Sequence, residues 1–88
     1  MEVKIEFNKK KCGVLAYDNN LLIGECTFIE NQDVWNIVHT EVNKEYQGHG
    51  IARKLVEAVV FNAKENNKRI VADCSYARKI LNENKENI

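Results

Sequence analysis

The first half of the chain contains four segments in which apolar and polar residues alternate, separated by short polar turns. Alternation with a period of two is typical of half-buried β-strands. We expect strands at about residues 2–7, 12–17, 21–30 and 34–42. Since the turns have only about three to five residues, consecutive strands must pair antiparallel and form a meander.

A helix is predicted directly after Gly50. On a wheel of about 100° per residue its apolar residues form one continuous arc, and charged residues fill the other side. Phe61 alone interrupts the charged side, so it is either an incidental exposed aromatic or a contact for a partner. Residues 69–74 follow as a fifth strand, and a strand–helix–strand succession implies a parallel crossover.

These patterns predict an α+β fold, with a mostly antiparallel sheet and one β-α-β crossover. The central helix is expected at about residues 50–66, and a short C-terminal helix at about 76–84. Eighty-eight residues provide one modest hydrophobic core. We therefore expect a single domain over residues 1–88.

The composition excludes several classes of protein. The formal net charge is zero, whereas proteins that grip nucleic acid usually carry a basic excess. No apolar run approaches the roughly 18 residues that span a bilayer. The N-terminus lacks the apolar region of a signal peptide. We expect a cytoplasmic protein that binds neither nucleic acid nor membranes.

The three cysteines are Cys12, Cys26 and Cys74, an odd number at wide spacings. This pattern does not form a disulfide framework, and free thiols are expected in a reducing compartment. No Cys-x-x-Cys pair occurs, and neither histidine lies at zinc-finger spacing from a cysteine. We expect no metal site.

A glycine-containing loop, Gly48-His49-Gly50, precedes the central helix. The third glycine of a dinucleotide-binding fingerprint is missing, and the loop does not match a phosphate-binding Walker A sequence. Helix N-termini offer unpaired N–H groups that favour phosphate oxygens, and glycines let the backbone approach a ligand closely. The loop is therefore an anion-binding site or simply a tight strand-to-helix turn.

Residues 42–52 resemble the acetyl-CoA-binding motif of the GNAT superfamily of N-acetyltransferases. In that motif Gln or Arg, two residues of any kind, Gly, any residue, and Gly or Ala cradle the CoA pyrophosphate. Gly48 and Gly50 match, but Glu45 occupies the Gln/Arg position. Gln47 stands directly before the first glycine, where Arg often stands in the family.

The segments His39–Val42 and Cys74–Tyr76 extend this resemblance to the minimal GNAT-like family named for its cysteine and glycine. It covers the chain from about Leu21 to Leu81. The family's frequent proline before the cysteine is absent, and Ala72 and Asp73 stand in its place.

The resemblance implies that acetyl-CoA lies in a cleft where the fourth and fifth strands separate. The pyrophosphate would meet the backbone N–H groups of residues 47–52, the pantetheine would follow residues 40–42, and the thioester would reach Cys74. The implied cofactor-binding residues are Thr40, Val42, Gln47, Gly48, His49, Gly50, Ile51 and Ala52. The resemblance also implies an acetyl-cysteine intermediate and an aliphatic amine as the acceptor, which can be part of a macromolecule.

Cysteine chemistry agrees with a two-step route, because a thiolate readily attacks a thioester once its pKa is lowered. Arg78, or a helix N-terminus near Ser75, could lower the pKa of Cys74. Direct attack by an amine on acetyl-CoA needs no nucleophilic residue, and buried cysteines are common as small apolar residues. Cys74 is therefore a nucleophile or a structural residue, whereas Cys12 and Cys26 are expected to be structural.

Candidate acid–base residues flank this cysteine and the fourth strand. Strict alternation puts His39 and Glu41 on one strand face with Trp35 and Ile37. His39 is then a core residue or a catalyst, and Glu41 a general base acting through water or a surface carboxylate. Tyr76 either protonates the leaving CoA thiolate or packs on the pantetheine.

Two functions agree best with these residues, and a third, a nucleic-acid-associated protein, agrees least because the net charge is zero. The first is an acetyl-CoA-dependent N-acetyltransferase that acts on an unidentified amine, with Cys74, Glu41 and Tyr76 as catalytic residues. The second is a non-catalytic CoA-binding module for protein interaction, because so short a chain has few loops for an acceptor pocket.

Overall fold

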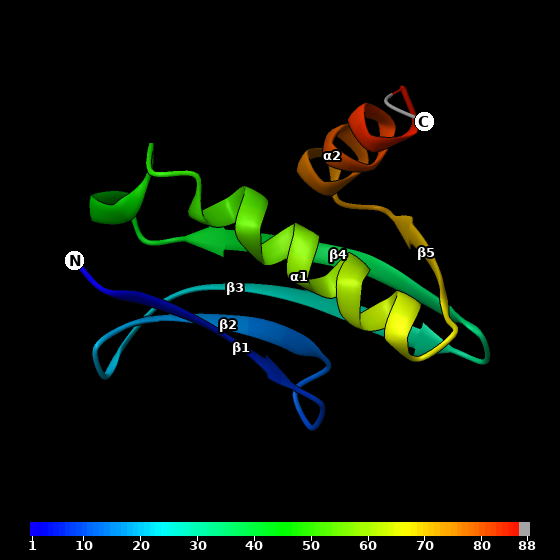
Figure 1. The fold of residues 1–88 in the computed structure, drawn as a ribbon, viewed down its shortest axis with the longest axis horizontal. Helices are drawn as coiled ribbons and strands as arrows, with labels where there is room; N and C mark the ends of the chain where they lie inside the picture. The colour runs from blue at the N-terminus through cyan, green and yellow to red at the C-terminus, as the bar shows by residue number, and fades with distance from the viewer. Residues whose placement is uncertain (87–88) are drawn as a thin grey trace.

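Five strands form one sheet in the order of the sequence, β1-β2-β3-β4-β5, in a computed structural model that describes residues 1–86. The first four strands pair antiparallel, and β5 pairs parallel to β4 after a helical crossover (Figure 1). The predicted α+β fold is thus confirmed. The elements are β1 (Val3–Asn8), β2 (Gly13–Asp18), β3 (Leu21–Asn31), β4 (Val34–Val42), the 3-10 helix η1 (Lys44–Tyr46), α1 (Ile51–Glu65), β5 (Arg69–Ala72) and α2 (Ser75–Glu86).

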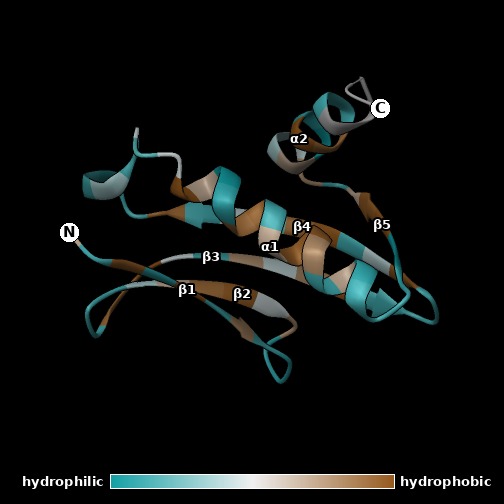
Figure 2. Cartoon of the chain, in the orientation of Figure 1, coloured by the Kyte–Doolittle hydropathy of each residue, from teal (hydrophilic) through white to brown (hydrophobic). Residues whose placement is uncertain are grey.

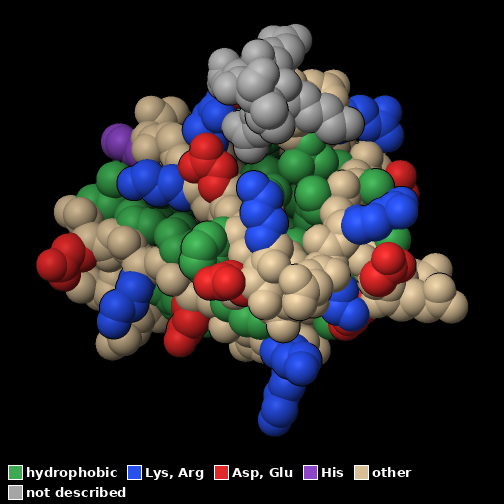
Figure 3. Space-filling model, turned by 45° about the vertical axis from the view of Figure 1, so that its right-hand side comes forward, with side chains coloured by type: hydrophobic (Ala, Val, Ile, Leu, Met, Phe, Trp, Pro, Cys, Tyr) green, Lys and Arg blue, Asp and Glu red, His purple; other side chains and the backbone are tan. Residues whose placement is uncertain are grey.

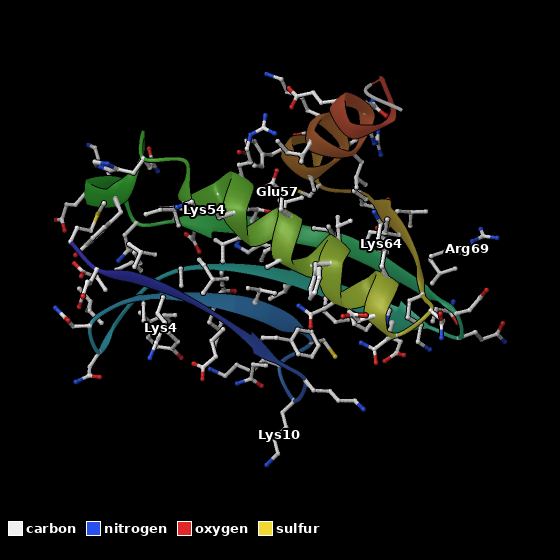
Figure 4. All side chains as sticks on the ribbon, in the orientation of Figure 1. Lys4, Lys10, Lys54, Glu57, Lys64 and Arg69 are labelled. Atoms are coloured by element: carbon white, nitrogen blue, oxygen red, sulfur yellow. The ribbon has the colours of Figure 1, made fainter. Side chains whose placement is uncertain are left out.

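The helix α1 packs along one face of the sheet with its apolar arc toward the strands (Figures 1 and 2). Burying this arc supplies much of the core, because removal of apolar surface from water drives packing. Charged residues lie on its outer side, where Lys54 and Glu57 are exposed (Figure 4). Phe61 has 62% of its surface exposed, as expected from the wheel. The buried residues of α1 are Ile51, Leu55, Val56, Val59, Val60 and Ala63.

A β-bulge interrupts the pairing of β3 with β4. Thr27 pairs with His39, but the next residue, Phe28, pairs with Ile37, so Val38 is an extra residue in β4. An extra residue shifts the alternation of side chains by one position. The residues of β4 on either side of Val38 therefore follow different alternation patterns.

The bulge overturns one expectation from the sequence. Trp35 and Ile37 are buried in the core as expected, but His39 and Glu41 are on the opposite face, with side chains 53% and 67% exposed. Thr40, which pairs with the buried Cys26, takes the core side in their place. The prediction that His39 and Glu41 share a face with Trp35 and Ile37 is thus wrong, because strict alternation does not continue through the bulge.

The strand β5 is shorter than the sequence predicts, ending at Ala72 instead of Cys74. The backbone N–H groups of Asp73 and Cys74 both donate to the carbonyl oxygen of Ile37, at 3.0 and 3.1 Å. Two consecutive residues cannot donate to the same strand neighbour and remain extended, because N–H directions alternate along a strand. The chain therefore turns away from β4 at this point and enters α2.

Charged side chains are distributed over the surface without a large single-sign patch in the view of Figure 3. Lys10 projects from the β1–β2 turn and Arg69 points outward from the start of β5 (Figure 4). None of the helices within residues 1–86 has the length and apolarity needed to cross a membrane.

Candidate active site

The strands β4 and β5 separate halfway along β4. Val34–Ile37 pair with Arg69–Ala72. Beyond this point β4 continues to Val42, while the segment that follows β5 turns into α2 (Figure 1). Within residues 1–86, no strand pairs with residues 38–42 on this side. The glycine loop lies beyond the end of β4, and Cys74 lies where the strands separate.

The glycine loop has a backbone that suits glycine. Gly48 and Gly50 have φ of 85° and 75°, in the left-handed region that other residues enter only with strain. A Cβ atom at either position would meet no atom within 4 Å. The requirement for glycine is therefore conformational, and the space beside both residues is open.

The N-terminus of α1 presents several unpaired donors. Lys54 N–H donates to the Gly50 carbonyl at 3.2 Å, the first helical hydrogen bond, and no side chain caps the helix. Among the described residues, none accepts a hydrogen bond from the backbone N–H groups of residues 48–53. The first turn also contains no acidic residue. Free N–H groups and the helix dipole together favour an anion here.

The backbone N–H of Gln47 is not free to bind an anion, and its side chain holds the loop in place instead. Its N–H already donates to the carbonyl of Lys44 at 3.3 Å. Its side-chain Nε2 donates to the carbonyl of Val42 at 3.1 Å, which ties the loop to the end of β4. The expected set of N–H donors, residues 47–52, is therefore corrected at Gln47, because η1 uses that donor internally.

A cavity of about 290 Å³ lies beside the loop. It brings together seven of the predicted site residues from β4, the loop, α1 and α2. Tyr46 also lines it and was missed, although it stands inside the glycine motif; Thr40 and the exposed His49 do not line it. The lining residues are Val42, Tyr46, Gln47, Gly48, Gly50, Ile51, Ala52 and Tyr76.

Tyr46 connects the loop to the β2–β3 hairpin. Its hydroxyl donates to Oδ2 of Asp18 at 2.6 Å, and Oδ1 of Asp18 accepts from the backbone N–H of Glu2 at 3.1 Å. These hydrogen bonds hold the pKa of Asp18 below its ordinary value, and the bond from Tyr46 has the larger effect. The N-terminal side of the loop is thus anchored twice, by Gln47 on β4 and by Tyr46 on Asp18.

We expect this contact to make stability depend on pH. A carboxylate whose pKa is lower in the folded state stabilises the fold above about pH 4, and this contribution is lost as pH falls through the folded pKa. The urea midpoint of Tyr46→Phe should therefore fall less steeply below about pH 4 than that of the wild type. Tyr17→Phe is the matched control; equal slopes for Tyr46→Phe and wild type would refute the contact's role.

Cys74 is the residue immediately before α2, and its carbonyl accepts the N–H of Arg78 at 2.9 Å. A reciprocal pair of hydrogen bonds fixes the turn that carries it. Asn36 Nδ2 donates to Oδ2 of Asp73, and Asp73 N–H donates to Oδ1 of Asn36, both at 2.9 Å. Asn36 therefore helps to hold the turn that carries the thiol against β4.

The environment of Cys74 favours its thiolate. Partial burial raises the pKa of this thiol, but N–H groups of Ala77 and Tyr76 in α2, with Thr40, hold it below the ordinary value. Arg78 is engaged elsewhere, since its guanidinium donates to the carbonyl of Ala72 at 3.1 and 3.2 Å. Of the two groups expected to lower the pKa of Cys74, the N-terminus of α2 therefore does so, whereas Arg78 does not.

The other predicted catalytic residues lie on different faces. Tyr76, 38% exposed, lines the cavity and is two residues from Cys74. Glu41 lies on the sheet face away from α1, where its Oε2 is 3.4 Å from Nε2 of His39. Cys26 is fully buried, and burial raises its pKa to about 11, as expected for a structural residue. No group of three metal-ligating side chains occurs within residues 1–83, whose side chains the structure describes.

Comparison with known proteins decides the family. The family model described as GCN5-related N-acetyl-transferase matches residues 2–87, almost the whole chain. The chain belongs to the GCN5-related N-acetyltransferase (GNAT) family. The resemblance predicted from the glycine loop and Cys74 is confirmed. A comparison with curated proteins finds no match.

Solved GNAT structures share this fold. A GCN5-like protein from Staphylococcus aureus is 33% identical, with a TM-score of 0.71, over 94% of this chain and 81% of that one. A GNAT acetyltransferase from Elizabethkingia anophelis with acetyl-CoA bound is 23% identical, with a TM-score of 0.65, over 84% and 53%. A GCN5-related N-acetyltransferase from Sphaerobacter thermophilus is 22% identical, with a TM-score of 0.66; 70% of this chain matches only 21% of that one.

Proposed function

We propose that this GNAT domain, residues 1–88, transfers the acetyl group of acetyl-CoA to an amine through an acetyl-cysteine at Cys74. The observation that carries the proposal is that the cavity beside the glycine loop is also lined by Tyr76, which is two residues after Cys74 at the start of α2. The free N–H groups at residues 48–53 suit a pyrophosphate, and the lowered pKa of Cys74 suits a nucleophile. The GNAT family assignment supports acetyl-CoA as the co-substrate.

In this proposal the pyrophosphate binds the N–H groups of Gly48, His49, Gly50, Ile51 and Ala52. The pantetheine follows residues 40–42 of β4, whose edge lacks a strand partner within residues 1–86. An extended ligand can hydrogen-bond to such a free edge as an added strand would. Val42 and Tyr76 line the cavity between the loop and this edge.

The reaction then proceeds in two steps. The Cys74 thiolate attacks the thioester carbonyl of acetyl-CoA, a new C–S bond forms, and the CoA thiolate leaves. A neutral amine next attacks the acetyl-cysteine, the amide forms, the Cys74 thiolate departs, and the amine loses its proton. Tyr76 donates a proton to the departing CoA thiolate. Glu41 accepts the amine proton through water, on the sheet face away from α1.

The test is incubation with isotope-labelled acetyl-CoA, followed by measurement of the intact protein mass. We expect the mass of one acetyl group to be added to the wild type and to Cys12→Ala. Cys74→Ala should bind CoA but gain no acetyl group, because the attacking sulfur is absent. An adduct that persists in Cys74→Ala would contradict the cysteine intermediate.

Calorimetry with CoA separates the remaining outcomes. Tight binding without an adduct, and without turnover on any amine, is the behaviour of a non-catalytic CoA-binding module. An adduct-free enzyme that turns over would instead transfer the acetyl group directly to the amine. Absence of CoA binding would refute the assignment of the loop.

A further inference from the structure

A threonine hydroxyl lies between two thiols at the point where the strands separate. Thr40 Oγ1 is 3.6 Å from Sγ of Cys74 and 3.5 Å from Sγ of Cys26. The three residues come from β4, from the turn before α2 and from β3, where Cys26 is directly opposite Thr40. Thr40 takes this position because the bulge at Val38 turns its side chain to the core side.

The donor and the acceptor of each hydrogen bond among Cys74, Thr40 and Cys26 can be assigned from the protons that these groups carry. With a neutral Cys74, its S–H donates to Thr40 Oγ1, and the Thr40 hydroxyl donates to Sγ of Cys26. A Cys74 thiolate has no proton to donate, so the Thr40 hydroxyl must turn and donate to it. Oγ1 of Thr40 is then free to accept a hydrogen bond from the S–H group of Cys26. Cys26 can supply it because burial keeps that thiol protonated.

We propose that Thr40 is a positioning residue whose hydroxyl reverses its hydrogen bonds when Cys74 ionises, with the buried Cys26 as donor at the far end. The proposal rests on the proposed function in one respect, that Cys74 acts as a thiolate. It assigns to Thr40 a side-chain role toward the nucleophile, separate from its backbone's place along the pantetheine.

Other ionisable groups near Cys74 are engaged elsewhere or face away. The carboxylate of Asp73 accepts from Asn36, and the guanidinium of Arg78 donates to a backbone carbonyl. On β4, His39 and Glu41 lie on the opposite face, and β3 contributes only Cys26 among the described contacts of Thr40. Tyr76, on α2, is half-exposed and lines the neighbouring cavity.

The test is the pH dependence of alkylation of Cys74 by iodoacetamide, resolved by site with mass spectrometry. Thr40→Val keeps the shape and removes the hydroxyl, so the pKa of Cys74 should rise by about one unit. Thr40→Ser keeps the hydroxyl and should retain a pKa near that of the wild type. Cys12, in the same samples, is the internal control and should not change.

Two results would overturn the proposal: an unchanged pKa in Thr40→Val, or an equal rise in Thr40→Ser, which would indicate packing alone. The experiment uses no acetyl-CoA, so its outcome is independent of whether an acetyl adduct forms. A second measurement needs no Thr40 variant: in Cys12→Ser, the Raman S–H stretch of Cys26 should move to lower frequency as Cys74 ionises. A Cys26 band that stays fixed through this titration would also refute the reversal.

Discussion

Replacement of Gly50 by valine should weaken CoA binding by about tenfold to a hundredfold. Gly50 has φ of 75° immediately before α1, and a β-branched residue is strained in this left-handed conformation. Relief of the strain would rotate the first N–H groups of α1 away from the pyrophosphate. Calorimetric titration with CoA measures the loss, and circular dichroism verifies that α1 still forms.

Gly50→Asn is the matched control for this substitution. Asparagine tolerates the left-handed region better than valine, and Asn19 and Asn67 adopt φ of 56° in this chain. Because a Cβ at position 50 meets no neighbouring atom, Gly50→Asn should bind CoA more tightly than Gly50→Val. Wild-type affinity in Gly50→Val would show that the loop conformation does not determine binding.

Replacement of Leu55 by alanine should lower the free energy of unfolding by about 2–5 kcal/mol. Leu55 is fully buried on α1, and its Cδ1 would lie 3.3 Å from a Cβ added to Gly24, so it packs directly on β3. Domains of this size have only about 5–15 kcal/mol in total. Urea unfolding followed by the fluorescence of Trp35, the single tryptophan, measures the loss.

Phe61→Ala on the same helix is the control for that measurement. Phe61 is exposed, so its removal should change the free energy of unfolding by no more than about 0.5 kcal/mol. A similar loss in both variants would mean that helix propensity, and not packing on the sheet, determines the effect at Leu55.

The bulge in β4 shows why part of the site could not be predicted. The alternation over residues 34–42 located the strand correctly, with the same bounds as β4. It could not reveal that Val38 is an extra residue, because a bulge is defined by the pairing of two strands. His39 and Glu41 were therefore assigned to the wrong face, and Thr40 was not associated with Cys74.

The glycine loop was predicted more completely. The order of residues placed Gly48 and Gly50 directly before a helix, and the positive φ of both glycines agrees with that position. Tyr46 was missed because its partner, Asp18, belongs to a hairpin 28 residues earlier. Asn36 was missed for the same reason, since its contact with Asp73 spans 37 residues.

The sequence by itself determined the strands, the buried face of α1 and the loop that precedes it, because periodicity and glycine act over a few neighbouring residues. Only the tertiary structure decided which side chains meet at Cys74. The thiol, the hydroxyl of Thr40 and the buried Cys26 come from three separate elements. Their approach depends on the strand register, on one extra residue in β4 and on the turn that ends β5, all of which arise from pairing between distant segments.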